Sequence, residues 1–131
     1  MKKNGLLNKE ISQVIAAMGH TDMLVICDVG FPVPFNVRYI DVSVCCGVPN
    51  FSVTVQAIAE DLCVEKWIIA EEIVNHNPTA LSALQKILGD LPVQKVTHDH
   101  IKALSQKAVA VIRTGECTPY ANVILVGGVP F

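Results

Sequence analysis

Short apolar runs, too brief to form helices, punctuate this sequence and constrain its fold more than any other feature. Each run is bounded by polar or turn-forming residues, and five apolar residues cannot make a stable helix by themselves. Runs of this kind are typical of strands buried on both faces of a sheet. Three segments fit the description: residues 23–27, 109–112 and 123–126.

Longer segments between these runs carry apolar side chains at helical spacing. We predict helices over residues 9–18, 78–88 and 98–106. Asn8, Asn77 and Thr97 precede them and are suitable N-cap residues. Alternating helices and buried strands predict an α/β fold: a three-layer sandwich in which helices cover both faces of a mainly parallel or mixed sheet.

Several segments give a weaker signal. Residues 51–59 are rich in β-branched side chains and are predicted to form a strand, and short strands are also expected near 39–44 and 93–96. Residues 63–74 fit a helix and a buried strand equally well. Gly19 follows the first helix and is expected to end it in the left-handed conformation.

Size and composition indicate one domain that associates with copies of itself. The 131 residues match the commonest domain size, so residues 1–131 are expected to fold as a single unit. Only 17% of the residues are charged, against roughly 25% in average soluble domains. Because 51% are hydrophobic, a monomer would expose large apolar patches, and we therefore expect a homo-oligomer.

The charge pattern and the termini exclude other classes of protein. The net charge is −2 and basic residues form no cluster, so nucleic acid is not an expected partner. No apolar run approaches the roughly 20 residues of a membrane span, and polar residues interrupt the N-terminus where a signal peptide would be apolar. We expect a cytoplasmic protein whose five cysteines are reduced thiols in the core.

Polar residues at the ends of predicted elements are the candidate site residues. His20 follows the first helix, whose C-terminal dipole favours a protonated imidazole. Asp28 follows the first strand, where a carboxylate could orient a histidine or bind a hydroxyl group. The alternative interpretations are a helix cap for His20 and a local turn for Asp28.

Two further segments carry polar groups suited to neutral ligands. Tyr120 and Asn122 lie in a late loop and could donate hydrogen bonds or merely close that loop. His98 and His100 are two residues apart, which on a helix directs them away from each other, so no metal site is expected. His76, between two asparagines at a helix start, is interpreted as a solvated surface residue.

The motifs together resemble the D-ribose pyranase family, which has more distant fucose mutarotase relatives. The resemblance rests on their order along the whole chain. The matching segments are Gly19-His20-Thr21-Asp22, Val25 to Asp28 with Gly30, Gly47-Val48-Pro49, Ala70-Glu71-Glu72-Ile73 before Asn77-Pro78, Thr97-His98, and Arg113-Thr114-Gly115-Glu116 before Pro119-Tyr120-Ala121-Asn122.

This resemblance implies an isomerase that interconverts the β-pyranose and β-furanose forms of free D-ribose without cofactor or metal. It implies that His20 is the catalytic proton donor, that Asp28, His98, Tyr120 and Asn122 bind the sugar, and that the chain assembles into a ring-shaped decamer with sites near subunit contacts.

Ring opening fits these residues because it needs one proton delivered to the ring oxygen and one taken from the anomeric hydroxyl. We expect Asp28 to orient His20 while Tyr120 and Asn122 hold sugar hydroxyls. The alternatives are a mutarotase for fucose or another aldose, and a sugar-binding subunit without catalytic activity.

Overall fold

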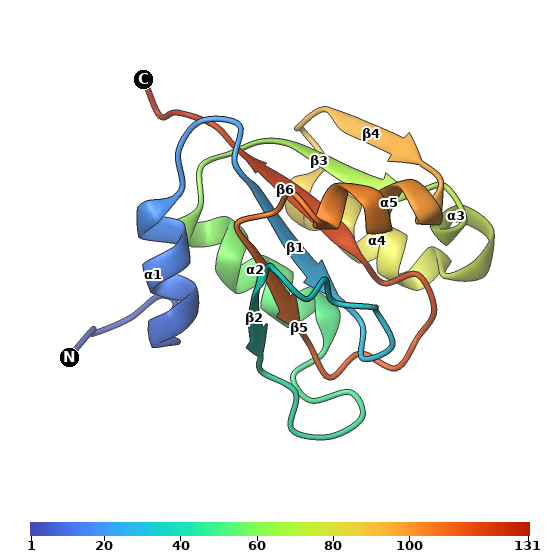
Figure 1. The fold of residues 1–131 in the computed structure, drawn as a ribbon, viewed down its shortest axis with the longest axis horizontal. Helices are drawn as coiled ribbons and strands as arrows, with labels where there is room; N and C mark the ends of the chain where they lie inside the picture. Colours follow the sequence, from blue (N-terminus) through green and yellow to red (C-terminus); the bar gives the residue numbers. More distant parts are fainter.

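The computed structural model describes residues 1–131 as a six-stranded mixed sheet with helices on both faces (Figure 1). The strand order is β2-β5-β1-β6-β3-β4, and β6 alone runs antiparallel to its neighbours. The predicted three-layer α/β fold is therefore confirmed, in its mixed form. The strands are β1 (Met23–Cys27), β2 (Arg38–Asp41), β3 (Val64–Ala70), β4 (Val93–Val96), β5 (Ala110–Arg113) and β6 (Val123–Gly127).

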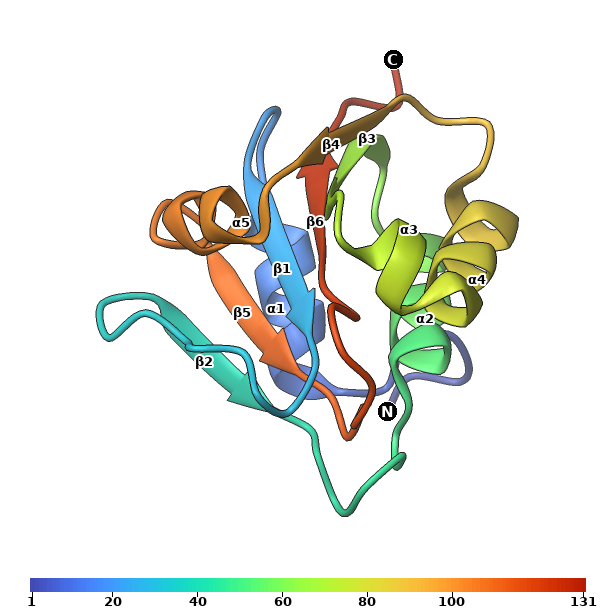
Figure 2. The same cartoon turned by 90° about the vertical axis from the view of Figure 1, so that its right-hand side faces the viewer.

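Five helices cover the sheet unequally. Figure 2 shows α5 on one side of the sheet and α2 and α4 on the other. No helix is both long enough and apolar enough to cross a membrane. The helices are α1 (Lys9–Ala17), α2 (Phe51–Asp61), α3 (Ile73–His76), α4 (Pro78–Leu88) and α5 (His98–Ser105).

The central strands have apolar side chains on both faces, which explains their uninterrupted apolar sequences. In β1, Leu24 and Ile26 face the larger core under α1, α2 and α4, whereas Val25 and Cys27 face a smaller core under α5. All four are fully buried. Such a strand is stable only when both layers of helices are in place.

Asparagine and threonine N-caps start most of the helices at the predicted positions. The Asn8 and Asn77 side chains accept backbone N–H groups at 3.0 and 3.1 Å, and the Thr97 hydroxyl accepts one at 3.2 Å. The end of α1 differs from the prediction. Gly19 is not left-handed; Thr21 is instead, with φ of 70°, because the chain turns two residues later into β1.

The strand predicted at residues 51–59 is wrong, because this segment is helix α2. Its buried side chains are Phe51, Thr54, Val55 and Ile58, which lie at helical spacing. Asn50 caps the helix by accepting the N–H of Val53 at 2.9 Å. β-Branched residues only weakly disfavour a helix, and burial of one apolar face outweighs that preference.

The undecided segment 63–74 contains strand β3 followed by the short helix α3. Trp67 to Ala70 are all buried, since β3 lies inside the sheet between β6 and β4. The predicted strand near 39–44 is the shorter edge strand β2, and the remaining predicted strands shift by no more than one residue at each end.

Two substitutions in α2 test its helical burial. Ile58 is fully buried, so Ile58→Ala should lower the free energy of unfolding by roughly 2–5 kcal/mol in a urea titration. Val53 is 59% exposed on the same helix, and Val53→Ala should change it by less than about 0.5 kcal/mol. Equal losses at both positions would contradict this packing.

Candidate active site

The antiparallel direction of β6 places two distant polar residues side by side. The register pairs Ile26 of β1 with Val123 of β6, so the residue after β1 adjoins the residue before β6. Asn122 donates through Nδ2 to Asp28 Oδ2 at 3.0 Å, and the backbone N–H of Asp28 donates to Asn122 Oδ1 at 3.0 Å. The fully buried Asn122 side chain thereby fixes the carboxylate at the sheet edge.

Burial raises the pKa of Asp28 above its usual value of 3.8, because a partly desolvated carboxylate is harder to ionise. The N–H of Gly30, the amide of Asn122 and the charge of His98 oppose this effect but do not cancel it. Asp28 is therefore a hydrogen-bonding group in a partly dry setting, suited to an uncharged polar ligand.

His98 and Tyr120 form an adjoining aromatic wall. Their ring centroids lie 5.1 Å apart in an edge-to-face arrangement, and Phe31 contacts the opposite side of His98 at 6.2 Å. His98 begins α5, and its backbone N–H donates to both carboxylate oxygens of Glu72 at 3.1 Å. Its Nδ1 is buried and has no hydrogen-bond partner within the chain, which is uncommon for a buried polar atom.

The loop after β5 forms one side of the site, and hydrogen bonds between its side chains and the backbone of neighbouring segments hold it in place. The Thr114 hydroxyl donates to the carbonyl of Cys27 at 2.8 Å. Glu116 accepts the N–H of Phe51 at 3.0 Å, which ties the loop to the start of α2. A Cβ atom at Gly115 would lie 2.4 Å from the Val48 carbonyl, so only glycine fits this approach.

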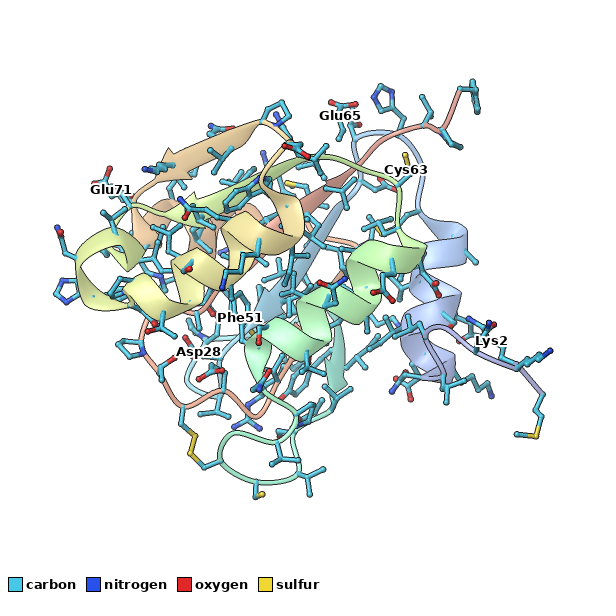
Figure 3. The ribbon with its side chains drawn as sticks, turned by 180° about the vertical axis from the view of Figure 1, so that it is seen from behind. Lys2, Asp28, Phe51, Cys63, Glu65 and Glu71 are labelled. Carbon is cyan, nitrogen blue, oxygen red and sulfur yellow. A yellow bond between two sulfur atoms is a disulfide. The ribbon has the colours of Figure 1, made fainter.

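A cavity of about 290 Å³ opens beside these groups, near the lower limit of roughly 300 Å³ for small-molecule pockets. Its wall combines the end of β1 with the loop after β5, and its position is marked by Asp28 in Figure 3. It is lined by Asp28, Val29, Gly30, Glu116, Cys117, Thr118 and Pro119.

His20 lies at the other end of the sheet. The loop that carries it precedes β1, whereas Asp28 follows β1, and five strand residues span roughly 17 Å. His20 Nε2 is 2.6 Å from Glu65 Oε2, and Figure 3 shows Glu65 at the opposite end of the molecule from Asp28. Asp28, His98, Tyr120 and Asn122 gather within one chain, but His20 does not join them. The expected contact in which Asp28 orients His20 is therefore wrong within one chain.

Two neighbours of the site were missed by sequence reasoning. The exposed His76 ring lies 5.3 Å from Tyr120, a contact between residues 44 positions apart that no local signal reveals. Arg113 donates to the Val29 carbonyl at 3.0 Å and pairs with Asp41 at 2.9 Å, which fixes the backbone next to Asp28. No group of three His, Cys, Asp or Glu side chains is arranged to hold a metal ion.

The cysteines differ from the expected set of reduced core thiols. Cys46 and Cys117 form a disulfide that links the loop before α2 to the cavity wall, with their Cα atoms 5.8 Å apart. Cys45 and Cys63 are free but exposed, and only Cys27 is buried. Burial raises the pKa of the Cys27 thiol well above its ordinary value, so it stays protonated.

Comparison with known proteins agrees with this fold. Residues 1–130 match the RbsD / FucU transport protein family. The chain is 49% identical to a D-ribose pyranase of Symbiobacterium thermophilum and 47% identical to one of Pasteurella multocida, in both cases over 100% of each chain.

Two solved structures share this fold. RbsD of Bacillus subtilis, solved in complex with D-ribose, superimposes with a TM-score of 0.97 at 44% identity over 100% of both chains. A fucose mutarotase of Streptococcus pneumoniae in complex with L-fucose has a TM-score of 0.81 at 21% identity, covers 95% of each chain and shares the fold. The chain belongs to the RbsD / FucU family, as its motifs predicted.

The hydrogen bond between Asp28 and Asn122 can be tested through the pKa of the Asp28 carboxyl group. Because the Asn122 amide stabilises the ionised carboxylate, Asn122→Ala should raise the pKa of Asp28 further, as measured by carbon-13 NMR titration of the carboxyl group. The Asp41 pKa, which the Ser43 hydroxyl and Arg113 help to lower to about 2, should not change and serves as the internal control.

The coupling between proton binding and folding gives the sign of the accompanying change in the free energy of unfolding. A carboxyl group with a raised pKa in the folded state binds its proton more tightly when folded, so its contribution is present at low pH and is lost as pH rises from 3.8 through the folded pKa. This loss should extend to higher pH in Asn122→Ala. An unchanged or lowered Asp28 pKa would contradict the assigned hydrogen bond.

Proposed function

We propose that this chain is a D-ribose pyranase, an isomerase that interconverts the β-pyranose and β-furanose forms of free D-ribose. One observation carries the proposal: Asp28, which is held by Asn122 and lies within reach of the charge of His98, lines a small cavity in a chain 49% identical to a D-ribose pyranase. These groups offer hydrogen bonds rather than salt bridges, as recognition of an uncharged pentose requires.

The reaction needs only proton transfers and one reversible bond cleavage. As the bond between C1 and the ring oxygen breaks, the imidazolium of His20 gives a proton to that oxygen. The neutral imidazole takes up the proton that the anomeric hydroxyl releases, which regenerates the imidazolium. Closure through the other hydroxyl reverses these transfers and yields the other ring size.

Each remaining site residue has a role in holding the sugar. Asp28 accepts hydrogen bonds from sugar hydroxyls and is itself held by Asn122. His98 binds the sugar through Nδ1, which has no other partner. Tyr120 forms the wall against which the sugar ring lies, and its hydroxyl group can hydrogen-bond to the sugar. A sugar held this way keeps its reacting oxygens in one place while the ring opens.

His20 must reach this site from a second copy of the chain, since within one chain the two lie at opposite ends of β1. We therefore propose a homo-oligomer, of which the ring-shaped decamer expected from the family resemblance is the specific form. Exposed apolar side chains supply surface for such contacts. They include Tyr39, Val44, Val48 and Val93.

We place the enzyme in the cytoplasm, where ribose taken up by the cell meets a kinase that uses the furanose form. The exposed Cys46–Cys117 disulfide is open to reduction in that compartment. Fractionation of cells that express the chain tests this location, and recovery with an extracellular fraction would contradict it.

NMR exchange spectroscopy on D-ribose tests the activity directly. The wild type should accelerate exchange between pyranose and furanose signals, and His20→Ala should reduce this acceleration by about 10²- to 10⁴-fold, the usual contribution of a positioned acid or base. His100 is exposed and does not line the cavity, so His100→Ala should match the wild type.

Different outcomes separate the rival functions. Faster exchange on L-fucose or another aldose than on D-ribose identifies a different mutarotase. Calorimetric binding of ribose with no acceleration of exchange identifies a sugar-binding subunit, and an unaffected His20→Ala variant removes His20 from the mechanism.

Mixing two inactive variants tests the shared site. His20→Ala protomers keep an intact Asn122, and Asn122→Ala protomers keep an intact His20. If subunits are unfolded and reassembled together at equal amounts, about a quarter of the sites should regain both residues by random pairing, and activity should return. Activity no higher than that of either variant alone contradicts a site shared between subunits, as does a stable monomer in light scattering.

A further inference from the structure

The loop that carries His20, residues 18–22, is held rigidly against the end of β6. Asp22 Oδ2 accepts the N–H of Gly19 at 2.8 Å, and Thr21 adopts a left-handed φ of 70°. Gly127 of β6 accepts the N–H of Thr21 and donates to the Asp22 carbonyl, both at 2.8 Å. This loop therefore presents His20 from a fixed backbone.

Glu65 faces this loop because β3 is irregular at its position. Val64 pairs with Gly127 and Lys66 pairs with Val126, so two steps along β3 correspond to one step along β6 and Glu65 has no partner of its own. A bulge of this kind redirects a side chain, and bulges are over-represented next to active sites.

Gly128 has no side chain, and this leaves space for Glu65 beside the end of β6. A Cβ atom there would lie 3.1 Å from Glu65 Cβ, and the Gly128 N–H donates to the Cys63 carbonyl at 2.8 Å. The backbone at the end of β6 thus lies directly beside Glu65. The result is the 2.6 Å contact between Glu65 Oε2 and His20 Nε2.

A contribution to the stability of the fold does not explain the His20–Glu65 ion pair. Its side chains are 53% and 46% exposed, and exposed ion pairs contribute little to folding. Its geometric effect is definite, however. A carboxylate can only accept a hydrogen bond, so Nε2 must carry the proton, and in the neutral ring Nδ1 is the unprotonated nitrogen.

We propose that Glu65 is a positioning residue that fixes the ring and tautomer of His20, so that Nδ1 is the atom that exchanges protons with the sugar. This inference rests on the proposed function for its catalytic part. The carboxylate also balances the positive charge of the imidazolium. Because both residues belong to one chain, the pair reaches a neighbouring protomer's site as a unit.

Nitrogen-15 spectra of the histidine rings test the positioning without any sugar. In the wild type, neutral His20 should be protonated at Nε2, with its signals assigned by their loss in His20→Ala. Glu65→Ala should convert His20 to a mixture of tautomers. Glu65→Gln should keep the wild-type tautomer, because the glutamine carbonyl still accepts from Nε2. Glu10→Ala, which removes an exposed carboxylate on α1, is the control.

Exchange kinetics test the catalytic consequence. Glu65→Ala should lower kcat by roughly 10- to 100-fold, by analogy with the loss when a carboxylate that orients a metal-bound histidine is removed, with KM for D-ribose nearly unchanged. Glu65→Gln should recover part of this loss. An unchanged tautomer, or an unchanged kcat, in a folded Glu65→Ala variant overturns the proposal.

The two measurements also separate this proposal from the function on which it rests. If the wild type accelerates no sugar exchange but His20 loses its tautomer in Glu65→Ala, the pyranase assignment fails while the positioning by Glu65 stands. If exchange is normal and the tautomer is unaffected, the pyranase assignment stands and the role of Glu65 fails.

Discussion

The antiparallel insertion of β6 between β1 and β3 is the constraint on which the site depends. Five of the six strands run the same way, and polar residues that follow their carboxyl ends gather at one edge of the sheet. Because β6 runs in the opposite direction, the residues before it reach that edge as well. The Asp28–Asn122 pair exists only because of this reversal.

The same strand organises the opposite edge of the sheet. At its far end Gly127 fixes the His20 loop and Gly128 leaves room for Glu65, while the register shift on β3 turns Glu65 toward His20. One strand thus supports the Asp28–Asn122 pair at its start and the His20–Glu65 pair at its end.

The wrong strand at residues 51–59 and the undecided segment 63–74 have one physical cause in common. Residues 51–61 carry residues that favour strands, yet they form helix α2 because Phe51 and Ile58 must both enter the larger core. Residues 63–74 could not be assigned because burial on both faces of β3 removes the alternation that identifies a strand. Contacts with the rest of the molecule decided both segments.

The sequence by itself determined the starts of α1, α4 and α5, the apolar strands β1, β5 and β6, and the candidates for the site, because N-caps, uninterrupted apolar runs and family motifs are local patterns. Tertiary structure alone decided which of those residues meet. It joined Asp28 to Asn122 across 94 positions, brought His76 to Tyr120, and paired His20 with Glu65 rather than Asp28. Strand order and direction set these distances, and no short stretch of sequence encodes either.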